Sequence, residues 1–161
     1  MSARSEALAQ RIELGAGNLV AFAERLSDAQ WNTTVPPDGR TVGVIVHHVA
    51  SVYPIEVQLA GILASGKPVE GVTWAGIAEM NAKHAHEHAM AGKQETIDLL
   101  RRNSRAAAEA VRAFTDEQLD SAACLSLNAD APLTAQFMIE DHALRHSWHH
   151  LQKIRGVLGE P

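Results

Sequence analysis

Apolar residues recur at steps of three and four along most of the chain, which is typical of amphipathic helices. The first such stretch covers residues 3–26, and its apolar side is formed by Leu8, Ile12, Gly15, Leu19, Phe22 and Leu26. A second helix is predicted to begin after Thr41, a good capping residue, and to end at about Ala64. Pro54 lies inside this helix and has no amide proton, so we expect a kink or a break there.

A shorter helix and two long ones are predicted to follow. The shorter helix covers residues 74–90, and the next long helix covers residues 93–114. The residues at 115–132 are expected to form a connection. The last helix is predicted to begin near Leu133 and to continue to about Gly159, where glycine favours a helix end.

The predicted elements define an all-α fold. A run of β-branched residues between Val42 and Val49 resembles a strand, but the helical spacing continues beyond it, and no strand is predicted. Four helices of more than five turns fit an antiparallel four-helix bundle, with the helix at 74–90 as a short extra element. A chain of 161 residues has room for one such domain, residues 1–161, and not for a second of normal size.

Charge and cysteine content narrow the range of partners and compartments. The formal net charge is -5, and among 14 basic residues only Arg101 and Arg102 are adjacent, so we expect neither nucleic acid nor an anionic membrane as a partner. We expect no stretch to approach the roughly 20 apolar residues of a membrane span, and the polar N-terminus does not resemble a signal peptide. Cys124 is the single cysteine, so no intrachain disulfide can form, and a cytoplasmic location is expected.

Two histidines near the C-terminus have the spacing of metal ligands. His146 and His150 are four residues apart, so their Cβ atoms lie about 5–6 Å apart on one side of a helix. His48, on the predicted second helix, faces the bundle interior and offers a third imidazole. Three imidazoles leave a coordination position open on a divalent ion, as in catalytic sites. Either Glu140 or Asp141 would be placed to orient one of the ligand rings.

The remaining histidines are expected to have other roles. His47 is turned by ~100° from His48 and is not expected to bind the ion. The group between residues 84 and 88 is predicted to lie on the solvated surface, although two of its members share a helix face and form a competing metal site; it consists of His84, His86 and His88. His142 and His149 have no assigned role.

Two longer motifs in the chain resemble the DinB/YfiT-like superfamily of small helical metalloproteins. The first is Leu26-Ser-Asp-Ala-Gln-Trp31 followed by Pro36-Pro-Asp-Gly-Arg-Thr-Val-Gly-Val-Ile-Val-His-His-Val-Ala50. The second is His146-Ser-Trp-His-His-Leu-Gln-Lys-Ile154. The resemblance places the three metal-ligating histidines of the family on His48, His146 and His150. Many relatives have Gln where this chain has Lys153, three positions after the last ligand.

The resemblance implies a four-helix bundle with a three-His site for Zn²⁺, Ni²⁺ or a similar ion, and a homodimer. The superfamily includes mycothiol- and bacillithiol-dependent transferases and isomerases. We therefore expect a divalent-metal-dependent enzyme that acts on a small-molecule substrate, either as a thiol-dependent S-transferase or isomerase using a low-molecular-weight thiol, or as a hydrolase. Two alternatives are a metal-stabilised binding module without turnover and a helical dimerisation domain whose histidines line an interface.

Overall fold

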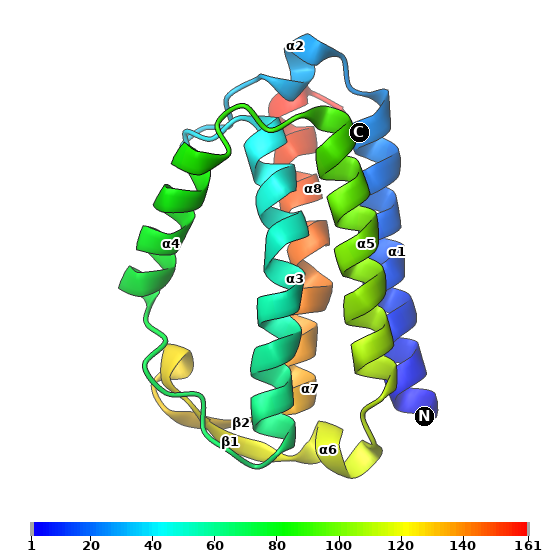
Figure 1. The fold of residues 1–161 in the computed structure, drawn as a ribbon, viewed down its shortest axis with the longest axis vertical. Helices are drawn as coiled ribbons and strands as arrows, with labels where there is room; N and C mark the ends of the chain where they lie inside the picture. The colour runs from blue at the N-terminus through cyan, green and yellow to red at the C-terminus, as the bar shows by residue number, and fades with distance from the viewer. Residues whose placement is uncertain (1, 161) are drawn as a thin grey trace.

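Four long helices lie side by side in the computed structural model, which describes residues 2–160 (Figure 1). The first three are α1 (Ala3–Arg25), α3 (Val42–Ala64) and α5 (Lys93–Arg112). The fourth is continuous but composite: it consists of α7 (Ala135–Met138), a π-helical segment (Ile139–Leu144) and α8 (Arg145–Leu158). The predicted all-α four-helix bundle is therefore confirmed.

Two one-turn helices connect the long ones. They are α2 (Asp28–Trp31), which follows α1, and α6 (Asp116–Asp120), which follows α5. Each begins with a capping box: Ser27 exchanges hydrogen bonds with Gln30 in the first, and Thr115 with Gln118 in the second. The similar sequences at these two places thus produce the same local structure.

Pro54 does not break α3, so of the kink or break expected from the sequence the break is excluded. The helix continues from Val42 to Ala64 through the proline, whose own side chain is exposed. The carbonyl of Ala50 would normally accept the amide proton that Pro54 lacks. The side-chain amide of Asn103, on α5, donates to that carbonyl instead, at 2.8 Å. A neighbouring helix therefore satisfies the acceptor that the proline leaves free.

A small hairpin corrects the prediction that the chain has no strand. β1 (Ala122–Leu125) pairs antiparallel with β2 (Ala131–Thr134). The connecting turn contains two residues with left-handed backbone, Ala129 and Asp130. Strands of four residues are too short for alternation of polar and apolar positions to be distinguished from loop sequence.

α3 lies in the core, and its apolar composition bears on the expectation that the chain has no possible membrane span. Within residues 2–160 it is the one helix whose length and composition would suit a membrane span, so the expectation that no stretch reaches this length was wrong. However, 67% of its apolar window is buried in the structure. A helix that is apolar on most sides is typical of a buried core helix as well as of a membrane span.

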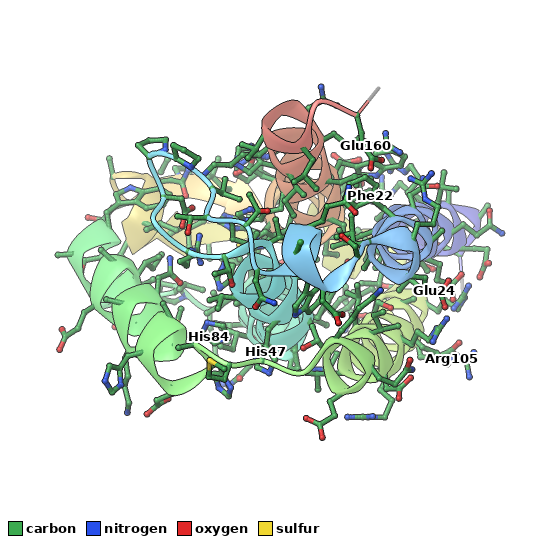
Figure 2. The ribbon with its side chains drawn as sticks, turned by 90° about the horizontal axis from the view of Figure 1, so that it is seen from above. Phe22, Glu24, His47, His84, Arg105 and Glu160 are labelled. Carbon is green, nitrogen blue, oxygen red and sulfur yellow. The ribbon has the colours of Figure 1, made fainter. Side chains whose placement is uncertain are left out.

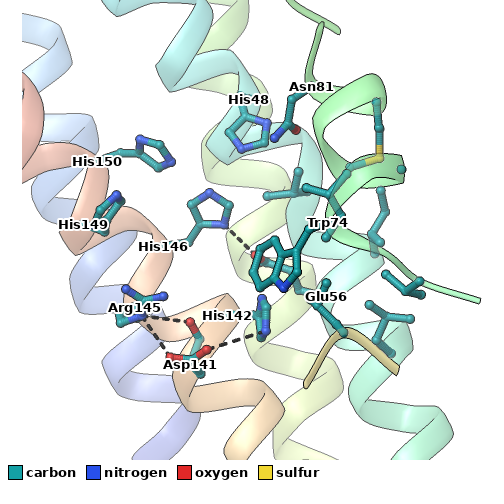
Figure 3. A pocket seen from close by; sticks show the side chains of 18 of the residues that line it. His48, Glu56, Trp74, Asn81, Asp141, His142, Arg145, His146, His149 and His150 are labelled. Atoms are coloured by element: carbon teal, nitrogen blue, oxygen red, sulfur yellow. Dashed lines mark hydrogen bonds and ion pairs between the residues drawn. The ribbon is translucent and has the colours of Figure 1, made fainter. Parts of the chain in front are cut away.

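The shorter extra helix, α4 (Trp74–Glu87), lies outside the four-helix bundle and contacts α3 (Figure 1). It begins at Thr73, whose hydroxyl accepts a hydrogen bond from the amide of Gly76. None of its residues is buried. Its importance is positional, because it stands beside the stretch of α3 that carries His48 and Glu56 (Figure 3).

Candidate metal centre

Three histidines from two helices converge between α3 and α8 (Figure 3). They are the three predicted ligands, His48, His146 and His150, and one nitrogen of each lies within 4.8 Å of those of the other two. Their ring centroids are 4.8–5.6 Å apart. Two nitrogens bound to one tetrahedral Zn²⁺ at about 2.0–2.1 Å are about 3.3 Å apart. Small rotations of the rings would therefore bring all three within reach of a single ion.

Burial keeps two of these imidazoles neutral. His48 is 5% exposed and His150 is 7% exposed. Desolvation, with the nearby His146 as the next cause, lowers the pKa of His48 to about 3 and that of His150 to about 2. A metal ligand must be a neutral imidazole. In addition, Nδ1 of His150 is buried without a hydrogen-bond partner, which fits a site built for an ion.

A buried carboxylate orients the third imidazole. Oε1 of Glu56 accepts a hydrogen bond from Nδ1 of His146 at 2.6 Å, and Glu56 is only 6% exposed. This bond fixes the tautomer and leaves Nε2 of His146 as the nitrogen available to an ion. The hydroxyl groups of Tyr53 and Ser147, which are 2.6 Å apart and buried, join α3 to α8 beside this pair.

The two carboxylates proposed from sequence for this role have other partners. Asp141 forms an ion pair with Arg145 at 3.1 Å, and Glu140 forms one with Arg11 at 2.9 Å. Sequence reasoning missed Glu56, although a signal was present. Glu56 is eight residues after His48 on the same helix, so the two lie on one face of an otherwise apolar element.

The three histidines line a pocket of about 640 Å³, a size typical of sites for small molecules. One wall is apolar and is provided largely by α4, through Trp74, Ile77 and Met80. The imidazole of His142 lies on the wall as well, and burial lowers its pKa.

A charged group borders the pocket near His48. Asp38 accepts hydrogen bonds from Arg40 and from Lys153, the latter at 2.8 Å. The hydrogen bond from Arg40 holds the pKa of Asp38 well below its usual range. Lys153, which stands where many relatives have Gln, thus contacts the carboxylate of Asp38 in the loop before α3. Nη1 of Arg40 is buried and has no hydrogen-bond partner.

The other histidines divide into an exposed pair and a second cluster. His86 and His149 are exposed. His84 and His88 are half-buried and face His47 on α3, so the expectation that they lie on the solvated surface was wrong. Helical spacing alone could not reveal this cluster, because it depends on how α4 leans against α3.

Comparison with known proteins agrees with the fold. The sequence matches the DinB superfamily over residues 11–154.

The chain belongs to the DinB superfamily.

Solved structures place this DinB-superfamily chain among four-helix proteins. YfiT from Bacillus subtilis, described as a probable metal-dependent hydrolase with an unusual four-helix bundle topology, matches with a TM-score of 0.75 and 18% identity. That match covers 100% of this chain and 91% of YfiT. The mycothiol-dependent maleylpyruvate isomerase matches with a TM-score of 0.71 and 12% identity, over 93% of this chain and 60% of the isomerase. No curated protein matches the sequence significantly.

Acidification is expected to destabilise the metal-free protein. The pKa values of His48 and His150 in the folded state, about 3 and about 2, lie below the value near 6.5 of an exposed imidazole. The unfolded chain therefore binds more protons as the pH falls below about 6.5, and the free energy of unfolding falls with it. Each imidazole accounts for a loss of about 2 kcal/mol between pH 7 and pH 5.

Urea denaturation of metal-free protein at the two pH values measures this loss. The variant His48→Gln/His150→Gln has no imidazole at either buried position and is the matched control. Its stability should depend less on pH than that of the parent protein. An equal dependence in both proteins would show that other groups are responsible.

Proposed function

We propose that this protein is a metal-dependent enzyme that acts on a small molecule, with a low-molecular-weight thiol as co-substrate. His48, His146 and His150 would hold the divalent ion, Zn²⁺ or Ni²⁺. The proposal rests on one observation: three imidazoles from two helices converge on the wall of a pocket of about 640 Å³. Three protein ligands leave room at the ion for a further ligand from the pocket.

The residues around the three histidines suit such a reaction. When bound, a divalent ion supplies a Lewis acid that keeps a small thiol in its thiolate form at neutral pH. Glu56 holds the ring of His146 in one orientation. The apolar wall with Trp74 and Ile77 suits the apolar part of a substrate. The unpaired Nη1 of Arg40 offers a hydrogen bond and a positive charge to an anionic group.

The structural relatives support this proposal and suggest a second reaction. The isomerase is described as mycothiol-dependent, which supports thiol chemistry, although this chain spans only 60% of its length. YfiT is described as a probable metal-dependent hydrolase and matches over 100% of this chain. Hydrolysis is therefore the second candidate. In either case we expect a homodimer in the cytoplasm, with no nucleic-acid or membrane partner.

Thiol binding is expected to be visible in the cobalt-substituted protein. Co²⁺ occupies sites built for Zn²⁺, and a thiolate bound to it gives an intense charge-transfer absorption in the near ultraviolet. Mycothiol, bacillithiol and glutathione would be added in turn to the Co²⁺ protein. At least one should produce the band, and the variant His146→Ala/His150→Ala should produce none when both proteins also carry His88→Ala, which weakens the second histidine cluster.

The result separates the candidate functions. A fully loaded Co²⁺ protein that shows no band with any of the three thiols would contradict thiol-dependent chemistry. Hydrolysis of activated esters and amides by the Zn²⁺ protein would then be measured, with the same variant as the control. A protein that binds the ion but shows neither property is a metal-stabilised binding module, and the enzyme proposal fails.

A further inference from the structure

A second histidine cluster lies between α3 and α4 (Figure 2). His47 comes from α3, His84 from the last turn of α4, and His88 is the residue that caps the C-terminal end of α4. Nδ1 of His47 and Nε2 of His84 are 2.8 Å apart. The rings of His47 and His88 are stacked with centroids 4.0 Å apart, and those of His84 and His88 are 4.7 Å apart. One nitrogen of each ring lies within 4.8 Å of those of the other two, as in the first cluster.

Hydrogen bonding within the protein accounts for only part of this convergence. Among the described residues, the His47 side chain has only two hydrogen-bond partners, the His84 nitrogen and the hydroxyl of Ser51 at 3.2 Å. Nδ1 of His84 is buried and has no hydrogen-bond partner. None of the three imidazoles forms an ion pair with a carboxylate in the part of the chain that the structure describes. A shared ligand would explain why the ring of His88, which has no hydrogen bond to either of the others within residues 2–160, also converges on them.

Two carboxylates line a pocket next to the cluster. His47 and His88 line a second pocket, of about 380 Å³, together with Glu87 at the end of α4 and Glu95 at the start of α5. A carboxylate oxygen can serve as the fourth ligand of a tetrahedral ion and offsets part of its charge. The surroundings of the cluster are thus suitable for a cation.

We propose that His47, His84 and His88 form a second site for a divalent transition-metal ion, so that the chain binds two ions. Imidazole ligands select Zn²⁺, Ni²⁺, Co²⁺ or Cu²⁺ over Mg²⁺ and Ca²⁺. The two sites are neighbours, because His47 and His48 are consecutive and the ring of His84 lies 5.6 Å from that of His48. An ion at the second site would join α4 to α3 and so fix the apolar wall of the pocket that α4 provides.

The number of bound ions tests this proposal directly. Untagged protein would be stripped of metal, dialysed against Zn²⁺ or Co²⁺, and analysed for metal per chain. We expect two ions per chain for the parent protein and one for His84→Ala/His88→Ala. His86→Ala changes an exposed histidine of the same helix and should keep two. His146→Ala/His150→Ala should keep one, at the second site, which separates this proposal from the proposed function.

Two further measurements keep the outcome decisive. Because His84 also contacts His48, the single variant His88→Ala is included; it should lower the affinity for the second ion more than 10-fold and leave the first unchanged. Circular dichroism checks that each variant is folded. A parent protein that binds one ion, or a folded His88→Ala variant that still binds two ions with the affinity of the parent, would overturn the proposal.

Discussion

Replacing His150 by alanine is expected to lower the affinity of the first site for Zn²⁺ more than about 100-fold, since loss of a residue that only orients a ligand already costs 10–100-fold. His150 is buried, and its Nδ1 has no hydrogen-bond partner within the protein. Competition with a chromophoric chelator measures the affinity. The variant His88→Ala should serve as the background in this experiment, so that the second cluster does not contribute.

Two matched variants make this prediction sharper. Glu56→Gln keeps the size of the side chain but weakens the hydrogen bond that orients His146, and should cost about 10–100-fold in affinity. His149→Ala removes the exposed imidazole next to His150 and should cost nothing. If His149→Ala weakens binding as much as His150→Ala does, the geometric assignment of the ligands is wrong.

Replacing Gly43 by alanine is expected to destabilise the folded protein by about 1–3 kcal/mol, as overpacking of a core does. A Cβ atom at this position would lie 2.5 Å from Cε2 of Trp31 and closer still to Nε1. Trp31 is buried and donates a hydrogen bond from Nε1 to the carbonyl of Ala91 at 3.0 Å. The ring cannot move away without weakening that bond. Urea denaturation gives the change in the free energy of unfolding.

Gly61→Ala is the control for this substitution. Gly61 belongs to the same helix, α3, and a Cβ atom there would have no neighbour within 4 Å. Alanine should therefore stabilise the helix at this position by roughly 0.5–1 kcal/mol. The two variants are expected to have effects of opposite sign. A stabilising effect of Gly43→Ala would mean that Trp31 relaxes at little cost.

The close approach of Gly43 and Trp31 also shows what the sequence motif encodes. Both residues belong to the first motif that resembles the DinB/YfiT-like superfamily, and they lie in contact in the structure. The helical spacing was sufficient to predict the bundle. Together with the four-residue separation of His146 and His150, it also selected the three histidines of the first cluster. These features depend on periodicity within single helices, which a sequence displays directly.

Features that depend on contacts between helices could not be predicted in the same way. Pro54 was expected to disturb α3, but Asn103 from another helix satisfies the free carbonyl. The cluster around His47 requires the particular inclination of α4 against α3, and no spacing specifies it. Glu56 is an intermediate case. The sequence shows that it shares a helix face with His48, but its hydrogen bond to His146 depends on how α8 packs against α3.

The absence of buried residues in α4 has a consequence for how molecules reach the pocket. Local opening costs least where few apolar contacts hold a segment, so the amides of α4 should exchange with deuterium well before those of α3. Transient detachment of this one helix would widen the entrance while His48, His146 and His150 keep their places in the bundle. α4 would then control entry to the pocket, while the bundle helices would hold the three histidines in place.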